Sequence, residues 1–144
     1  MIIDYFGKDF SKLGKKKLFL FDMDGTIYME GKLFNGVTEL LEKIVKNEGK
    51  YVFITNNSSK SVKDYIERLS KMGIPCDESN FYTSTQASCE LFKDRFEGEL
   101  VYAQGTDSFL KELKENGIKV TTQFEQGIGA ILVAYDSEIT GAKL

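Results

Sequence analysis

The stretch "KLFLFDMDGTIY", residues 17–28, decides the fold that we expect for this chain. Four apolar residues run without a break from Leu18 to Phe21, which is typical of a strand that is covered on both faces in a parallel sheet. The run ends at Asp22, and Asp24 follows two residues later. Residues i and i+2 of an extended chain point to the same side, so we expect the two carboxylates to converge beyond the strand. In open α/β sheets, ligands bind at this carboxyl edge.

The sequence after this stretch alternates between helical and strand patterns. Further strands are predicted over 51–54, 80–84, 99–104, 118–121 and 129–136, and helices over 36–49, 61–73, 85–96 and 106–117. The first helix should bury a face made of Val37, Leu40, Leu41, Ile44 and Val45. Ser61 should cap the second helix, and Thr106 or Asp107 the last. This alternation predicts an α/β protein with a right-handed parallel sheet.

The two aspartates at the end of the first strand allow several kinds of chemistry. Carboxylates this close repel each other unless a cation lies between them or one of them is protonated. Mg²⁺ suits a site that offers one or two carboxylates and leaves the other positions to water or phosphate. A carboxylate can also attack phosphorus, while a second one protonates the leaving group and then activates water. The alternative is that Asp22 and Asp24 form only an Asx turn. An EF-hand fits less well, because Leu33 occupies the position of its last glutamate.

A second polar motif, "ITNNSSKS", residues 54–61, follows the next predicted strand. Its hydroxyls, amides and backbone N–H groups precede a predicted helix N-terminus, which favours an anion. The alternative is that the motif is only a turn and a helix cap. An acidic motif and an anion-binding motif at the carboxyl ends of adjacent strands carry more weight together than either does alone.

Composition excludes several other classes of protein. The 144 residues are 42% hydrophobic, enough for a core, and the net charge of −3 argues against a nucleic-acid partner. The chain has no histidine, which excludes Ser-His-Asp or Cys-His catalysis by this chain alone and argues against zinc. Cys76 and Cys89 form neither a disulfide framework nor a CxxC pair. No apolar run reaches membrane-spanning length, and the first residues are unlike a signal peptide, so we expect a cytoplasmic protein without a membrane partner.

Four stretches of the chain resemble those of one enzyme superfamily. "FDMDGTIY" and "VFITNNSSKS" are similar to the first two signatures of the haloacid dehalogenase (HAD) superfamily in its phosphatase form. "VYAQGTDSFLKELKENGIKV" and "AILVAYDSEIT" resemble the NagD-like branch, which includes p-nitrophenyl phosphatases, phosphoglycolate phosphatases and nucleotide phosphatases. The resemblance runs from about residue 17 to the end. It implies a Rossmann-like three-layer parallel core into which an α/β cap is inserted.

The same resemblance implies roles for individual residues. Asp22 would be the nucleophile and a Mg²⁺ ligand, and Asp24 the general acid/base that also gives its backbone carbonyl to the metal. Thr55 and Asn56 would hold the phosphoryl group. The segment Tyr28–Gly36 resembles the hairpin flap of the family. The implied function is a Mg²⁺-dependent phosphomonoester hydrolase that forms an aspartyl-phosphate on a small phosphorylated metabolite.

Two elements that the family requires are not found in this sequence, namely a phosphate-binding lysine and a further acidic pair for Mg²⁺. We expect residues 1–84 to be the N-terminal part of the core, residues 85–144 to begin the cap, and the chain to end within it. Lys60 and Lys63 are interpreted as solvated helix-surface residues. The alternatives are a phosphotransferase or mutase of the same superfamily and a non-catalytic phosphate- or metal-binding remnant. We expect this chain alone to hydrolyse phosphate esters poorly and to form homo-oligomers through the apolar strand 130–134.

Overall fold

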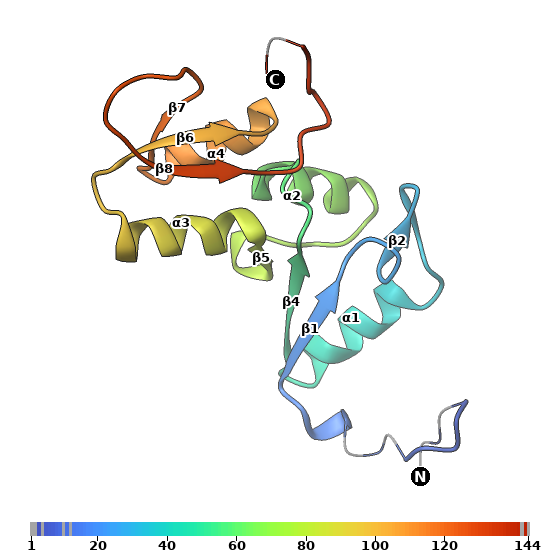
Figure 1. Cartoon of the computed structure of the whole chain (residues 1–144). Helices are drawn as coiled ribbons and strands as arrows, with labels where there is room; N and C mark the ends of the chain where they lie inside the picture. The colour runs from blue at the N-terminus through green and yellow to red at the C-terminus, as the bar shows by residue number, and fades with distance from the viewer. Residues whose placement is uncertain (1–2, 4, 10, 12, 142, 144) are drawn as a thin grey trace. The chain divides into compact units, whose positions relative to one another are not determined.

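The computed structural model describes residues 3, 5–9, 11, 13–141 and 143, and it divides the chain into two compact units, Met1–Phe53 and Ile54–Leu144 (Figure 1). The first unit contains β1 (Leu18–Asp22), β2 (Tyr28–Met29), β3 (Lys32–Leu33), α1 (Val37–Lys46) and most of β4 (Lys50–Thr55). The second contains α2 (Val62–Lys71), β5 (Phe81–Thr83), α3 (Ser84–Arg95), β6 (Leu100–Gln104), α4 (Asp107–Glu115), β7 (Lys119–Thr121) and β8 (Ile128–Val133). The boundary predicted between residues 84 and 85 stays a prediction.

In the first unit, β1 and β4 are neighbouring strands of one sheet, and the Lys50 N–H donates to the Lys17 carbonyl at 2.7 Å. The helix α1 forms where it was predicted, with Val37, Leu41 and Ile44 buried. Its predicted apolar face was too wide, because Leu40 and Val45 are exposed.

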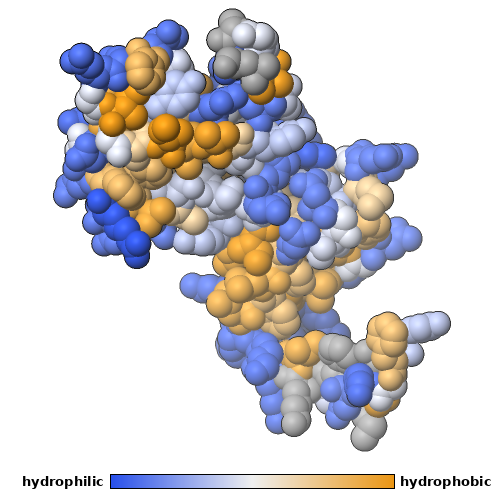
Figure 2. All heavy atoms as spheres, viewed as in Figure 1, coloured by the Kyte–Doolittle hydropathy of each residue, from blue (hydrophilic) through white to orange (hydrophobic). Residues whose placement is uncertain are grey.

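The prediction that β1 is covered on both faces is wrong. Leu18 and Leu20 are 59% and 57% exposed, whereas Phe19 and Phe21 on the other face are half-buried. Figure 2 shows apolar side chains on the surface in this region. An unbroken apolar run specifies a strand that can be buried on both faces, but it does not specify which neighbour covers it.

A short hairpin follows the aspartates, within the segment predicted as a flap. Tyr28 pairs with Leu33, and Met29 pairs with Lys32, in antiparallel register. The two loop residues, Glu30 and Gly31, have φ values of 49° and 80°. Positive φ at both positions is the geometry of a type I′ turn, which matches the twist of a hairpin. The hairpin is confirmed, and its action as a flap stays a prediction.

The second unit is built on a parallel sheet with the strand order β7-β6-β8. The helices α3 and α4 cover one face of this sheet (Figure 1), and the core there contains Cys89, Ala103, Phe109 and Leu113. Alternate residues of β8 are exposed, with Ile131 at 70% and Val133 at 66%. The parallel pairing confirms the predicted α/β class. No helix in the described part of the chain is long and apolar enough to cross a membrane.

The helix starts follow the predicted caps closely. The Ser61 hydroxyl accepts from the Asp64 N–H in a capping box, and the Thr106 hydroxyl accepts from the Phe109 N–H. The helix α3 begins one residue earlier than predicted, because Thr83 caps it. These side chains satisfy backbone N–H groups that have no partner within the helix.

Candidate functional site

The acidic motif forms a tight turn directly after β1. Met23 is fully buried, whereas Asp22 and Asp24 on either side of it are exposed, as expected for an extended chain. Gly25 has φ +83°, which only glycine adopts readily, and its N–H donates to the Tyr28 carbonyl at 2.8 Å. The buried methionine and the glycine turn therefore anchor the backbone while both carboxylates stay open to solvent.

The carboxylates in this turn have few partners of their own. The Thr26 hydroxyl donates to Asp22 Oδ2 at 3.4 Å, which is long for a hydrogen bond. Two exposed carboxylates fit Mg²⁺, which prefers oxygen ligands and keeps several waters. The described residues contain no group of three or more acidic, histidine or cysteine side chains that could hold a metal. The carboxylates of Asp22 and Asp24 therefore fit a metal ion whose remaining ligands are water or phosphate.

The polar motif after β4 is a hydrogen-bonded turn. Thr55 is 8% exposed, and its hydroxyl accepts from the Asn57 N–H at 3.1 Å. The Asn57 side-chain oxygen in turn accepts from the N–H and the hydroxyl of Ser59, at 3.0 and 2.7 Å. The turn interpretation is therefore right for Asn57. Asn56 is exposed, and phosphate binding by Thr55 and Asn56 stays a prediction.

Distant segments of the second unit hold this loop in place, and sequence analysis missed them. The Thr106 hydroxyl donates to the Ser59 carbonyl at 3.0 Å, and the Tyr135 N–H donates to the Ser58 hydroxyl at 3.1 Å. These bonds connect the loop to the start of α4 and to the residues after β8. No spacing rule could have found them, because the partners are 47 and 77 residues apart.

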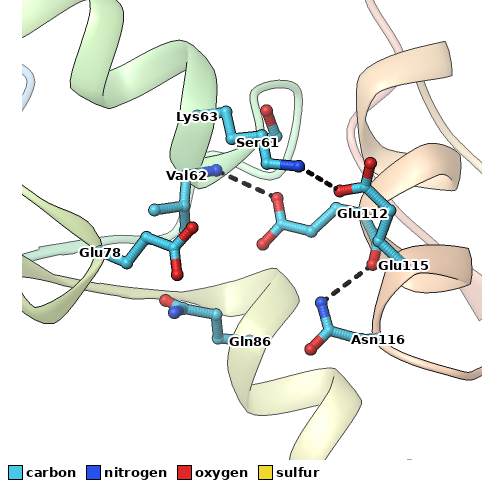
Figure 3. A pocket seen from close by; sticks show the side chains of 8 residues that line it. All are labelled: Ser61, Val62, Lys63, Glu78, Gln86, Glu112, Glu115 and Asn116. Atoms are coloured by element: carbon cyan, nitrogen blue, oxygen red, sulfur yellow. Dashed lines mark hydrogen bonds and ion pairs between the residues drawn. The ribbon is translucent and has the colours of Figure 1, made fainter.

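A cavity of about 140 Å³ lies beside the start of α2 (Figure 3). Glu112 of α4 is 7% exposed there, and its carboxylate accepts from the Val62 N–H at 3.1 Å. Burial raises the pKa of Glu112, and the nearby negative charges of Asp64 and Glu115 raise it further. Lys63 forms an exposed ion pair with Glu115 at 2.8 Å, which confirms that Lys63 is a surface residue.

We expect the buried charge of Glu112 to make the stability of the chain depend on pH. Because the pKa of Glu112 is raised in the folded protein, its contribution to stability is greatest below the ordinary glutamate pKa. This contribution is lost as pH rises through the raised value. Glu112→Gln keeps an acceptor for the Val62 N–H but cannot ionise. The difference between the two free energies of unfolding in urea, variant minus wild type, should therefore become more positive between about pH 4 and about pH 7. A difference that does not change with pH would contradict this expectation.

Both polar motifs belong to a stretch, residues 19–119, that matches the model of a family described as haloacid dehalogenase-like hydrolase. The match spans most of the chain, so the chain belongs to this family. Its likeness is to the branch of NagD, p-nitrophenyl phosphatases and phosphoglycolate phosphatases, as the sequence motifs predicted.

Two curated relatives illustrate this likeness. The chain is 28% identical over 137 residues to chloroplastic phosphoglycolate phosphatase 1A of Arabidopsis thaliana, covering 82% of this chain and 38% of that protein. It is 25% identical over 128 residues to an acid sugar phosphatase of Staphylococcus saprophyticus, covering 89% of this chain and 49% of the relative. The chain therefore spans half or less of the length of these curated relatives.

Solved structures confirm the fold. The crystal structure of a 4-nitrophenylphosphatase from Thermotoga maritima matches with a TM-score of 0.81 and 30% identity, over 91% of this chain and 49% of that one. A glycerol phosphate phosphatase from Mycobacterium tuberculosis, solved in complex with magnesium, matches with a TM-score of 0.80 and 22% identity. That match covers 90% of this chain and 39% of the other, and at this identity it supports the fold alone.

Proposed function

We propose that this chain carries the nucleophile, the general acid/base and the phosphate-binding loop of a Mg²⁺-dependent phosphomonoester hydrolase. The observation that carries the proposal is the family match over residues 19–119, which contains the Asp22-Met23-Asp24-Gly25-Thr26 motif. The relatives named above are phosphatases of small molecules. The substrate class that follows is a small phosphorylated metabolite.

Asp22 is the proposed nucleophile. One of its carboxylate oxygens attacks phosphorus, and the bond from phosphorus to the ester oxygen breaks, which leaves an aspartyl-phosphate. The carboxylate is suited to this step because it is exposed and accepts only a long hydrogen bond from Thr26 among the described contacts. When bound, Mg²⁺ supplies neutralisation of the negative charge on the phosphoryl oxygens.

Asp24 is the proposed general acid and base. In the first step its protonated carboxyl gives a proton to the departing ester oxygen. In the second step the resulting carboxylate takes a proton from water, and the water oxygen attacks phosphorus, releasing phosphate and restoring Asp22. The turn at Gly25 keeps Asp24 outside the apolar core, two residues after Asp22. Both carboxylates are exposed, so neither has to leave the core before it can react.

Thr55 and Asn56 are the proposed phosphoryl ligands. We expect Thr55→Val to weaken the binding of phosphate or vanadate by about 1–3 kcal/mol, because an oxygen of the bound anion loses the Thr55 hydroxyl as its donor. Thr55 also accepts from the Asn57 N–H, so the variant should lose about 1 kcal/mol of folding stability as well. Thr55→Ser keeps the hydroxyl and is the matched control. If Thr55→Val lowered the melting temperature but left vanadate affinity unchanged, the hydroxyl would serve only the turn.

Release of p-nitrophenol and phosphate from p-nitrophenyl phosphate, with and without Mg²⁺, tests the proposed reaction. Adding an alcohol distinguishes hydrolysis from phosphoryl transfer. A hydrolase releases inorganic phosphate in the presence of the alcohol, whereas a phosphotransferase converts the alcohol into a new phosphate ester.

A further inference from the structure

One face of α4 lies along the start of α2, within the Ile54–Leu144 unit. Three consecutive residues, 61–63, each bind an α4 side chain. The pairs are Ser61 with Ser108, Val62 with Glu112, and Lys63 with Glu115, and Figure 3 shows the last two. Both backbone N–H groups donate over 3.1 Å, and the ion pair is 2.8 Å long. Because the α4 partners are spaced four and three positions apart, they share one face of their helix.

Acidic side chains already fill the start of α2. The N–H groups that begin a helix have no partner within it, and this end of a helix attracts anions. Glu112, which is only 7% exposed, accepts from the Val62 N–H. Asp64 accepts from the Ser61 N–H at 2.8 Å. A phosphate that bound at this helix start would therefore have to displace a carboxyl group of the protein.

The same helix also holds the proposed phosphate-binding loop, residues 55–60, which precedes α2. The Thr106 hydroxyl at the start of α4 donates to the Ser59 carbonyl at 3.0 Å. Ser61 lies where the loop joins α2, and its N–H donates to Ser108. These two bonds fix the last residues of the loop to α4. A loop that is fixed in the free protein loses little conformational entropy when a ligand binds.

Free donor groups lie at the other end of the loop. The Thr55 hydroxyl accepts from the Asn57 N–H, so its own hydrogen can be donated to a ligand. The Asn56 side chain is exposed and makes no hydrogen bond with a described residue. Thr55 and Asn56, rather than the start of α2, therefore have donors to offer an anion.

We propose that Glu112 is a positioning residue for the phosphate-binding loop. Its side chain takes the place of an anion at the start of α2. This fixes one end of the loop and leaves Thr55 and Asn56 as the residues that bind phosphate. Glu112 does not touch the substrate, because it acts through the Val62 N–H. The proposal rests on the function proposed above, since the position of the loop matters to the reaction only if the loop holds a phosphoryl group.

The test follows amide chemical shifts in NMR while inorganic phosphate is added to the 144-residue chain. In the wild type, phosphate should shift the Asn56 amide and leave the Val62 amide unchanged, because the Val62 N–H is already bonded to Glu112. In Glu112→Ala, phosphate should shift the Val62 amide, and its dissociation constant at Asn56 should rise about fivefold or more. Glu112→Gln keeps an acceptor for this N–H and should restore the wild-type behaviour.

Val101→Ala is the control for a general loss of stability. Val101 is fully buried on β6, so the variant should unfold more easily, but it loses no side-chain hydrogen bond and should bind phosphate like the wild type. If Glu112→Ala did not fold, Glu112→Met replaces it, because methionine has a similar length but no oxygen acceptor.

Four outcomes would overturn the proposal. The first is a shift of the Val62 amide by phosphate in the wild type. The second is equal phosphate binding by the wild type and Glu112→Ala. The others are a loss of binding in Glu112→Gln, or in Val101→Ala, as large as that in Glu112→Ala.

Hydrogen exchange of the Ser61 amide without phosphate distinguishes this proposal from the phosphatase proposal. The Ser61 N–H is bonded to Asp64 and Ser108 and not to Glu112, so faster exchange in Glu112→Ala than in Glu112→Gln would support the positioning role. If phosphate shifted no amide of the loop, the phosphatase proposal would lose its phosphate-binding residues, and the exchange rates would still decide the positioning. If phosphate shifted Asn56 equally in every variant and the exchange rates were equal, phosphate binding would be supported and the positioning role would be wrong.

Discussion

Replacing Asp22 by asparagine should abolish the Mg²⁺-dependent release of phosphate from p-nitrophenyl phosphate. An amide cannot attack phosphorus to give an aspartyl-phosphate, so the rate should fall by at least about a thousandfold. The chain spans half or less of its curated relatives, so the assay is made on the longest gene product that contains it. Residual turnover within tenfold of wild type, roughly, would remove Asp22 from the mechanism.

The fold should survive this substitution. Asp22 is exposed, and its one described side-chain hydrogen bond, from Thr26, is long. The melting temperature should therefore stay close to that of the wild type. Asp94→Asn, which changes an exposed aspartate on α3, is the matched control and should keep full activity. Asp24→Asn should also be severely impaired, and it should accumulate the phosphoenzyme if a good leaving group needs no acid.

The largest loss of stability is expected for Leu113→Ala. Leu113 is fully buried on α4, where it packs with Cys89, Ala103 and Phe109 against the sheet. Removing three carbon atoms from such a core costs about 2–5 kcal/mol, a large part of the 5–15 kcal/mol that typically stabilises a domain. Amide hydrogen exchange of Val101 and Ala103 on β6 measures this loss within the second unit.

Lys114→Ala is the matched control for Leu113→Ala. Lys114 is the next residue along α4 and is exposed, and alanine is a good helix former. Its exchange rates should be close to those of the wild type. If Leu113→Ala changed the exchange free energy of β6 by less than about 1 kcal/mol, α4 would not anchor this sheet as the packing indicates.

Local features of the fold could be predicted because they depend on neighbours in sequence. The Ser61–Asp64 capping box and the hairpin across Glu30 and Gly31 involve residues at most five positions apart. The tight turn after β1 likewise follows from Gly25 and the alternation of buried Met23 with exposed aspartates. Hydrogen bonds and turn geometry at this range are set by backbone conformation, which a short sequence specifies.

The covering of the strands and helices could not be predicted in the same way. The apolar run of β1 and the helical face of α1 predict burial, yet Leu20 and Leu40 are exposed. Periodicity indicates which side chains share a face, but exposure depends on whether another element packs there. The candidate catalytic residues Asp22 and Asp24 could be proposed from the sequence because their spacing and residue types are local properties.

By itself, the sequence determined the order of strands and helices, their caps and the two polar motifs of this protein. Only the tertiary structure decided what holds the second motif, through the bonds from Thr106 to Ser59 and from Tyr135 to Ser58. It also decided that the hydroxyl of Thr85 is buried with no hydrogen-bond partner among the described residues. These contacts form when crossover connections bring distant segments together, and their geometry depends on packing that no local pattern encodes.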